Sequence, residues 1–285
     1  MPLLLLGVRD ELTDRPWRPP ARHWPGSPLS SPLIGGVDIQ AGGTWLAVHP
    51  DIPRVACLLN GRGTAAGPAR RRSRGELPLR AAAEGPDALK RLADDPAALA
   101  AYDPFHLICA TPDAVTALTW LGPPSPEAAP SPGAALPPGA ALPRGVAPSP
   151  GAAPARHPAV REIGAGTHLF SNAGHAYPAD PFHPEDPQGD TKAARFGDRF
   201  AAARPSGDPA LDIATAWGGW LTLAAGDGLD REDPRAIIVG KQLPDGRVYG
   251  STSLTFVALA PDAVRYDFQP EPGGVTGWYP VALSS

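Results

Sequence analysis

Residues 105–120 read FHLICATPDAVTALTW, two apolar runs on either side of the pair Pro112–Asp113. Short runs rich in β-branched and aromatic residues are typical of strands, and proline and aspartate are typical of tight turns. Two strands joined by so short a turn must pair antiparallel, because parallel neighbours need a crossover of a dozen or more residues. The stretch therefore predicts an antiparallel hairpin over 105–111 and 114–120.

The same pattern continues on both sides of this hairpin. Apolar runs separated by turn residues predict further strands at 3–8, 44–49, 54–60, 167–172, 236–240, 247–260 and 264–269. The pair Asp245–Gly246 predicts a type I′ hairpin before the strand that begins at Val248. Helical spacing of apolar residues predicts helices over 87–102, 192–203 and 209–223. Because the helices fall between blocks of strands, we expect an α+β architecture in which helices cover antiparallel sheets.

Composition limits the size and class of the protein. The chain has 285 residues, 42% of them hydrophobic and 19% charged, so it can bury a substantial core. Its net charge of -4 argues against a nucleic-acid binder, whose affinity comes from neutralising phosphates. Residues 122–158 are rich in proline, alanine and glycine and repeat the motif PGAAL. We expect a single domain over 1–285, interrupted by a disordered insert at 122–158; a proline-rich ligand for a partner protein is the alternative for the insert.

The two cysteines, Cys57 and Cys109, lie inside apolar runs. This placement predicts buried free thiols and gives neither a disulfide framework nor a CxxC metal pair. The opening PLLLLGV has no basic segment before it and is followed at once by charged residues, which is unlike a signal peptide. No apolar run approaches the roughly 18 residues of a membrane span. We therefore expect a cytoplasmic protein with no membrane span.

Arg9, Asp10 and Glu11 end the first apolar run. A guanidinium beside carboxylates at the end of a strand could orient a substrate carbonyl or a terminal amine, and a solvated loop with a local ion pair is the alternative. Gly42 and Gly43 come just before a strand, where backbone N–H groups could hold an oxyanion. An ordinary glycine turn explains this pair equally simply.

Asn60 and Asn172 each close an apolar strand, where a side-chain amide could donate to an oxyanion or could only form a turn. Four arginines at 70, 71, 72 and 74 could bind a phosphate, carboxylate or propionate, or could form a hydrated basic loop. The following Gly75–Glu76 is consistent with the start of a helix. Histidines and carboxylates at 175, 180, 183, 185 and 186 are separated by prolines and match no metal template, so we expect neither a metal nor a cofactor.

Six motifs, in order, carry a resemblance to a known family. They are VRDELTDRP at 8–16, DIQAGGTWLAV at 38–48, ACLLNGRG at 56–63, SRGEL at 73–77, FHLICA at 105–110 and GTHLFSNAG at 166–174. Together they resemble the NRDE family, also called the transport and Golgi organisation family. The resemblance implies a four-layer αββα sandwich like that of N-terminal-nucleophile hydrolases.

The resemblance also implies a site. Family members begin Met-Cys, and the exposed cysteine would be the nucleophile, with its own α-amine as base. Arg9 and Asp10 would flank that nucleophile, Asn60 would be an oxyanion donor, and Asn172 would lie in the same pocket. We expect Glu11, Gly42, Gly43, Thr44, Trp45 and Arg74 to bind the ligand. Haem, acyl-CoA and lipid metabolites are the ligands linked with the family.

The sequence departs from the family pattern in two places. Val8 replaces the asparagine of the motif, and residue 2 is proline, with no cysteine before Cys57. One hypothesis is therefore a carrier that binds a haem-like or acyl-CoA-like small molecule, and the other is an amide hydrolase whose cysteine lies upstream of a late start. The resemblance leads us to expect a missing first strand about a dozen residues upstream; a site built on the secondary amine of Pro2 is the rival.

Overall fold

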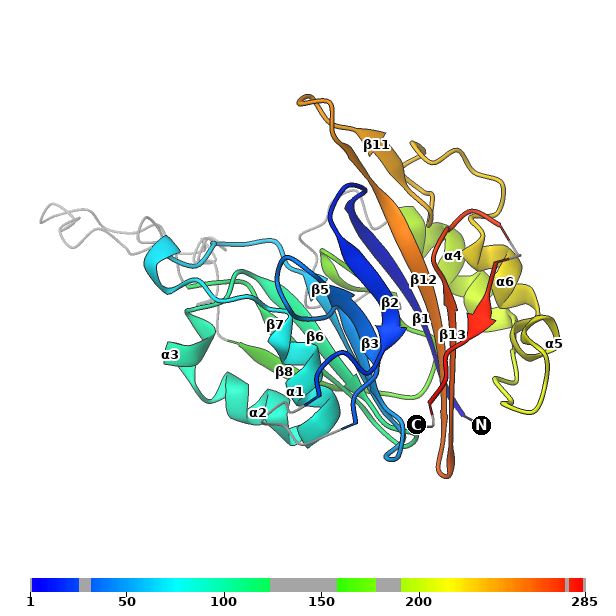
Figure 1. Ribbon diagram of the computed structural model, residues 1–285, viewed down its shortest axis with the longest axis horizontal. Helices are drawn as coiled ribbons and strands as arrows, with labels where there is room; N and C mark the ends of the chain where they lie inside the picture. The colour runs from blue at the N-terminus through cyan, green and yellow to red at the C-terminus, as the bar shows by residue number, and fades with distance from the viewer. Residues whose placement is uncertain (1, 26–31, 124–157, 178–190, 275–276, 284–285) are drawn as a thin grey trace, which may run out of the picture.

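The computed structural model describes residues 2–25, 32–123, 158–177, 191–274 and 277–283. Two five-stranded sheets organise the fold, and all their pairings are antiparallel (Figure 1). Sheet 1 has the order β1-β12-β13-β14, with β11 also paired to β12. Its strands are β1 (Leu3–Leu12), β11 (Gly240–Gln242), β12 (Val248–Ala260), β13 (Ala263–Gln269) and β14 (Tyr279–Pro280). Sheet 2 follows chain order through β4 (Leu46–His49), β5 (Arg54–Asn60), β6 (Phe105–Ala110), β7 (Val115–Trp120) and β8 (Ala159–Ile163).

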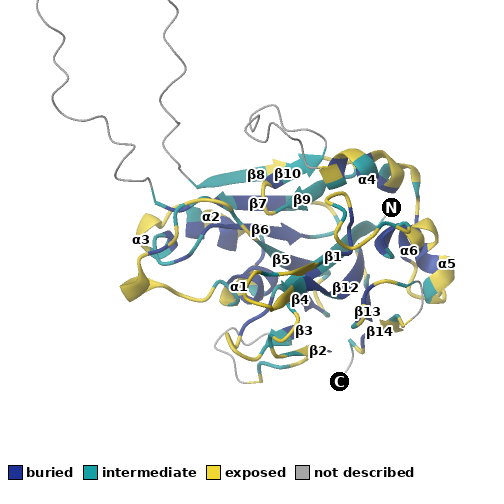
Figure 2. Cartoon of the chain, turned by 90° about the horizontal axis from the view of Figure 1, so that it is seen from above, coloured by how far each residue is buried: buried dark blue, intermediate teal, exposed yellow. Residues whose placement is uncertain are grey.

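Helices cover the outer face of each sheet (Figure 2). Sheet 2 is covered by α1 (Glu76–Glu84), α2 (Asp87–Ala93) and α3 (Pro96–Leu99), and sheet 1 by α4 (Thr191–Ala202), α5 (Ile213–Trp217) and α6 (Gly219–Ala224). Two small hairpins complete the fold: β2 (Trp17–Ala21) with β3 (Gly35–Asp38), and β9 (Leu169–Ser171) with β10 (Gly174–Tyr177). The expected α+β class, a four-layer αββα sandwich of antiparallel sheets, is confirmed.

Three hydrophobic clusters hold the four layers together. One lies between α1–α3 and sheet 2, and a second between α4–α6 and sheet 1. The third joins the two sheets, where Val48 and Val55 of sheet 2 meet Val257 and Phe268 of sheet 1. Each sheet therefore has two apolar faces, which explains why β12 is apolar at nearly every position from Leu254 to Leu259.

The structure confirms one predicted turn and corrects the other. Pro112–Asp113 forms a tight turn closed by Thr111 N–H donating to the Ala114 carbonyl at 2.9 Å. The type I′ prediction at Asp245–Gly246 is wrong, because only Gly246 has positive φ (84°) and a type I′ turn requires it at both positions. The strand expected at 236–240 is shifted to β11, since Ile237 and Ile238 are both buried against the helices and do not alternate.

Two predicted helices are interrupted. The stretch 87–102 divides into α2 and α3, because Asp95 caps α3 by accepting from Ala98 N–H at 3.0 Å and Pro96 follows it. The stretch 209–223 divides into α5 and α6 at Gly218. By contrast α4 lies within one residue of the predicted bounds, and α1 begins at Glu76, as the sequence suggested.

The proline-rich stretch falls mostly outside the described residues. Its two flanks are close together, because β7 pairs with β8 and Thr119 lies opposite Ala159. Strands β2, β3, β8, β10 and β14 were not predicted from the sequence. In the described ranges, no helix combines the length and apolar character needed to cross a membrane.

Candidate functional site

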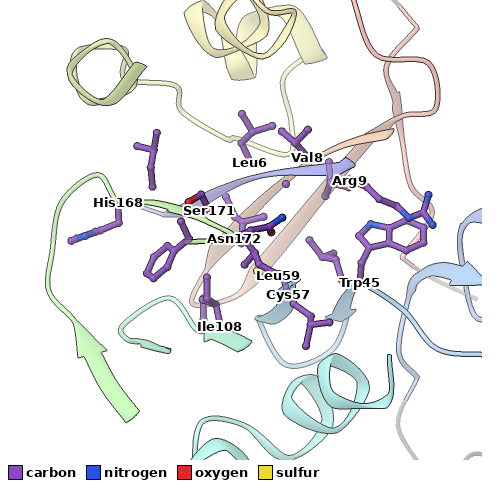
Figure 3. A pocket seen from close by; sticks show the side chains of 18 of the residues that line it. Leu6, Val8, Arg9, Trp45, Cys57, Leu59, Ile108, His168, Ser171 and Asn172 are labelled. Atoms are coloured by element: carbon purple, nitrogen blue, oxygen red, sulfur yellow. The ribbon is translucent and has the colours of Figure 1, made fainter. Parts of the chain in front are cut away.

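A cavity of about 1620 Å³ lies beside β1 (Figure 3). Its walls come from β1 itself, from the inner face of sheet 2, from the β9–β10 hairpin and from α4. Ligand pockets usually measure about 300–1000 Å³, so this one is large. Of the residues expected to form a site, those on its wall are Arg9, Asp10, Glu11, Gly43, Thr44, Trp45, Asn60, Arg74 and Asn172; Gly42 is not among them.

The cavity exists because sheet 1 stops before sheet 2 does. Sheet 2 continues through β6, β7 and β8, whereas in sheet 1 the strand on the cavity side is β1, whose described partner is β12 alone. Apolar side chains of sheet 2, including Ile108, Val115 and Ile163, face the cavity. Among the described strands, none of sheet 1 covers the inner face of sheet 2 beyond β1.

Arg9 lies within β1, because the strand continues to Leu12. This corrects the alternative of a solvated loop: Arg9 is only 7% exposed, and its guanidinium stacks on Trp45, with its carbon 4.4 Å from the ring centre (Figure 3). It also donates to Thr252 Oγ1 at 2.7 Å and lies 3.7 Å from Asp38 Oδ2. Arg9 is thus held by aromatic stacking and local hydrogen bonds.

A β-bulge separates the environments of Arg9 and Asp10. Arg9 is opposite Ser253 and Asp10 is opposite Ser251, so Thr252 is the extra residue of β12. Bulges are common beside functional sites, where they turn a side chain in a new direction. Asp10 accepts a hydrogen bond from Ser251 Oγ at 2.6 Å, and burial raises the pKa of its carboxyl group, opposed by this bond and by the charge of Lys192. Asp10 therefore keeps its proton to a higher pH than a surface aspartate does.

Glu11 has local partners. Its carboxylate accepts from Leu12 N–H at 2.9 Å and lies 3.6 Å from the guanidinium of Arg15. Arg15 in turn donates to Asp38 Oδ2 at 2.5 Å. Arg9, Asp10 and Glu11 therefore lie on one strand, but each has its own hydrogen-bonding partners.

The glycine pair has a packing role. Asp38 and Gly43 close a turn, in which Gly42 adopts a positive φ of 71° and donates its N–H to the Asp38 carbonyl. A Cβ on Gly43 would lie 2.4 Å from the backbone of Gly75, so only glycine allows this contact. The prediction of an ordinary glycine turn is correct for Gly42. At Gly43 the close backbone contact is with Gly75 of the same chain and not with a ligand. Through this contact the motif with Trp45 meets the motif with Arg74.

The arginine-rich segment is mostly paired. Arg71 forms an ion pair with Asp103, and Arg72 lies 2.7 Å from Glu76. Arg74 is half-buried and donates to the Pro104 carbonyl at 2.6 Å. Burial lowers the pKa of Arg74, opposed by Asp103. Arg62, on the other loop at this end of the cavity, is exposed and makes no hydrogen bond or ion pair with the described residues.

Both asparagines are exposed residues on the cavity wall. Asn60 is the last residue of β5, and Asn172 lies in the turn between β9 and β10, so the turn-forming explanation applies to Asn172. Sequence reasoning missed His168, Ser171 and Lys192, which also line the cavity. The signal for the first two was present in the motif GTHLFSNAG.

The thiols are free, as expected. Cys109 is buried, but Cys57 is only half-buried and faces the cavity, which corrects the expectation of two buried thiols. Burial raises the pKa of the Cys57 thiol to about 12, so it stays protonated at neutral pH. Pro2 lies seven residues before Arg9 on an extended strand, roughly 23 Å along it. Pro2 is therefore far from Arg9 along the strand, and the Cys57 thiol is in its protonated form, which is not the nucleophilic one.

The histidines and carboxylates at 175, 180, 183, 185 and 186, for which no metal site was expected, lie largely outside the described residues. Of these only His175 is described, and its Nε2 lies 3.0 Å from His168 Nδ1. His175 also stacks on Phe170, with ring centres 4.7 Å apart. In the described part of the chain, no three histidine, cysteine or carboxylate side chains could hold a metal ion.

The charge of the wall differs from that of the chain. Eight cationic and five acidic side chains line the cavity, although the net charge of the protein is -4. The arginines gather where the loops after β5 and before α1 meet, at Arg62, Arg71, Arg72 and Arg74. The cavity therefore has apolar walls and a cationic end.

Comparison with known proteins identifies the family. The sequence model of the family "Transport and Golgi organisation 2" matches residues 1–182. The chain belongs to this family. The resemblance stated above from the six motifs is thereby confirmed, and all six lie inside the matched range. A search of curated proteins found no match to the chain.

The transport and Golgi organisation 2 match ends within the segment after β10, before α4. The remaining part supplies β12, which pairs with β1 from Leu3↔Leu259 to Leu12↔Tyr249. The family motif Arg9–Glu11 therefore depends for its position on a strand from outside the matched range.

Proposed function

We propose that this protein binds a small amphipathic metabolite of the haem or acyl-CoA class in the cavity beside β1. The observation that carries the proposal is the cavity itself, with its apolar walls and its cationic end. Both ligand classes join a large apolar body to anionic groups, which are propionates in haem and phosphates in acyl-CoA. Apolar walls with a few placed charges are the usual arrangement of such sites.

Arg62 and Arg74 are the residues that suit the anionic group best. Arg62 has no partner among the described residues, and Arg74 uses one nitrogen for the Pro104 carbonyl and keeps its other donors. Asn60 adds an amide at the same end. The apolar body would contact Leu59 and Ile108 on sheet 2.

The alternative is an N-terminal-nucleophile amide hydrolase with an upstream cysteine. That reaction needs a nucleophile beside Arg9 and Asp10. In the described residues, the thiol on the cavity wall has a raised pKa, and Pro2 lies at the other end of β1. Asp10 is then a hydrogen-bonding and proton-holding residue of the wall.

Titration of the purified chain with haem and, separately, with a long-chain acyl-CoA tests the proposal. Haem binding is followed by the shift of the Soret band and acyl-CoA binding by calorimetry. Arg62→Gln should weaken binding of the ligand that fits about tenfold, because a hydrogen bond to a charged group contributes about 1.5–3 kcal/mol. Arg247→Gln is the matched control, since Arg247 is exposed, pairs with Asp245 and lies off the cavity.

The variant Arg74→Gln gives a second measurement, read together with its melting temperature because Arg74 also holds Pro104. Equal affinities for the wild type, Arg62→Gln and Arg247→Gln would contradict the assignment of the cationic end. Absence of binding for both ligand classes would contradict the proposed function.

A further inference from the structure

A cluster of arginines surrounds one serine. Residues 70–74 read RRRSR, so Ser73 has an arginine at each of the three positions before it and one directly after it. No other serine or threonine of the chain follows more than one arginine within three residues. Protein kinases that select basic substrates bind the arginines before the acceptor serine through carboxylates of their substrate groove. The sequence around Ser73 is therefore typical of a substrate of such a kinase.

The segment before this serine is exposed. All residues from 67 to 73 are exposed, and those from 71 to 73 form neither helix nor strand. The side chain of Arg70 makes no hydrogen bond or ion pair with the described residues. Arg71 and Arg72 form surface ion pairs, with both arginine side chains 56% exposed, and such pairs contribute little to stability. A kinase can therefore reach the serine and its arginines without unfolding a sheet.

Ser73 also lies on the wall of the cavity, together with its neighbours Arg72 and Arg74. Its Oγ accepts a hydrogen bond from Gly75 N–H at 3.2 Å, and Arg72 N–H donates to the Ala101 carbonyl at 2.8 Å. These two bonds keep the serine at the cationic end. A phosphate on its Oγ would therefore lie beside the arginines of that end.

The charge at this end matches one phosphate. Two of the four arginines are already balanced by carboxylates, whereas Arg62 and Arg74 form no ion pair with the described residues. A phosphoserine carries about −1.5 to −2 charges at pH 7, which cancels the charge of these two arginines. They are the same two residues that suit the anionic group of the ligand. The phosphate and the ligand would therefore compete for the same guanidinium groups.

We propose that Ser73 is a phosphorylation site for an arginine-directed serine/threonine kinase, and that its phosphate excludes the ligand from the cationic end. In the transfer, Ser73 Oγ forms a bond to the γ-phosphorus of ATP, and the bond from that phosphorus to the bridging oxygen breaks. The hydroxyl proton passes to a base of the kinase, and ADP leaves. The competition rests on the proposed function, whereas the modification does not.

Phosphorylation of the folded chain tests the site. The purified full chain is incubated with ATP and the catalytic domain of an arginine-directed kinase, and the product is analysed by intact mass and peptide mapping. One phosphate should appear, at Ser73, and Ser73→Ala should lower its incorporation by at least about tenfold. Arg70→Gln should slow incorporation about tenfold, because one recognised guanidinium is lost. Arg247→Gln, the exposed control away from the cavity, should leave the rate unchanged.

A peptide of residues 66–80 shows whether the fold allows access. The folded chain should react within about thirtyfold of the peptide's rate, because residues 67–73 are already exposed. A slower reaction of the folded chain would overturn the proposal, as would a phosphate mapped mainly to another residue. Protein from the native host, purified with phosphatases inhibited, should carry the phosphate on a fraction of its chains, and its absence would overturn the site.

Ligand titration of the phosphorylated chain tests the competition. Whichever of haem and acyl-CoA binds the unmodified chain should bind the phosphorylated chain at least about tenfold more weakly, because like charges meet at the cationic end. Phosphatase treatment should restore the affinity, and Ser73→Ala should bind as wild type does before and after kinase treatment. Equal affinities of the modified and unmodified chains would overturn the competition. Failure of the unmodified chain to bind either ligand would contradict the proposed function and the competition with it, and the mapped phosphate would still decide the site.

Discussion

Two neighbouring strands, β1 and β12, differ sharply in burial although their sequences are alike. Leu3–Val8 reads LLLLGV and its partner Leu254–Leu259 reads LTFVAL. The β12 segment is buried on both faces, whereas the β1 segment is half-buried throughout. The difference comes from the neighbours of each strand: among the described residues, β12 has strands on both sides, and β1 has one strand and a cavity. A strand's apolar sequence therefore indicates that it can be covered, and its neighbours decide whether it is.

The largest effect should come from a buried aspartate on β13, the strand that flanks β12 on the side away from β1. Asp267 lies on β13, opposite Phe256, and is fully buried. It accepts from Trp217 Nε1 at 2.6 Å and from Arg265 Nε at 2.5 Å. Asp267→Asn should lower the free energy of unfolding by about 3–5 kcal/mol, because it leaves a buried guanidinium without its counter-charge. Chemical denaturation measures this, and a loss below about 1 kcal/mol would contradict the buried ion pair.

Matched leucines sharpen the comparison between the two strands. Leu254 on β12 and Leu6 on β1 both pack against the outer helices, but Leu254 is fully buried and Leu6 is half-buried. Leu254→Ala should cost about 2–5 kcal/mol, and Leu6→Ala about 1 kcal/mol, since less apolar area is lost and no closed cavity forms. Denaturation curves of both variants give the two values. Equal losses would show that the edge of β1 is covered in solution.

The sequence predicted the parts of the fold that depend on local pattern. Strand β5 was predicted to the residue, and the hairpin at Pro112–Asp113 and helix α4 nearly so, because turn chemistry and apolar periodicity act within a few residues. It did not predict β2, β3 or β14, because these strands are short and contain proline or glycine, which are uncommon in strands.

Most of the residues singled out as a site could be predicted from the sequence, but the contacts that they make could not. Motif resemblance selected residues that the structure places around one cavity, including Asn60 and Asn172. It could not show that Arg9 is stacked on Trp45, or that Gly43 serves contact with Gly75, because these contacts join separate segments. It also missed His168, which is brought to the cavity by the β9–β10 hairpin.

A titrating group on β1 gives a smaller effect with a defined sign. Burial raises the pKa of Asp10 above 3.8, so its charged form is disfavoured in the folded protein. At neutral pH Asp10→Asn should change stability by less than about 1 kcal/mol, because the amide oxygen can still accept from Ser251. As the pH falls through the folded pKa, wild type takes up a proton that the variant cannot, so its stability rises relative to Asp10→Asn, and the gain is complete below 3.8. Melting curves from pH 7 to pH 3 measure the difference, and a relative loss of wild-type stability on acidification would contradict the raised pKa.

The smallest effect should be a gain, at Gly7 in the middle of β1. A Cβ there would lie 3.4 Å from Leu46 Cδ1 and 3.6 Å from Thr255 Cβ, which are ordinary contact distances, and its φ is not positive. Glycine inside a strand is less favourable than alanine by roughly 0.5–1 kcal/mol, because it loses more conformational freedom on folding. Gly7→Ala should therefore raise stability by about 0.5 kcal/mol, whereas Gly43→Ala should lower it, since its Cβ would lie 2.4 Å from the Gly75 backbone. The pair uses one chemical change in two settings, so thermal unfolding of both variants separates strand geometry from close backbone contact. A loss at Gly7 equal to that at Gly43 would mean that β1 is not the regular strand, paired along β12 from Leu3 to Arg9, on which the contrast between the two strands rests.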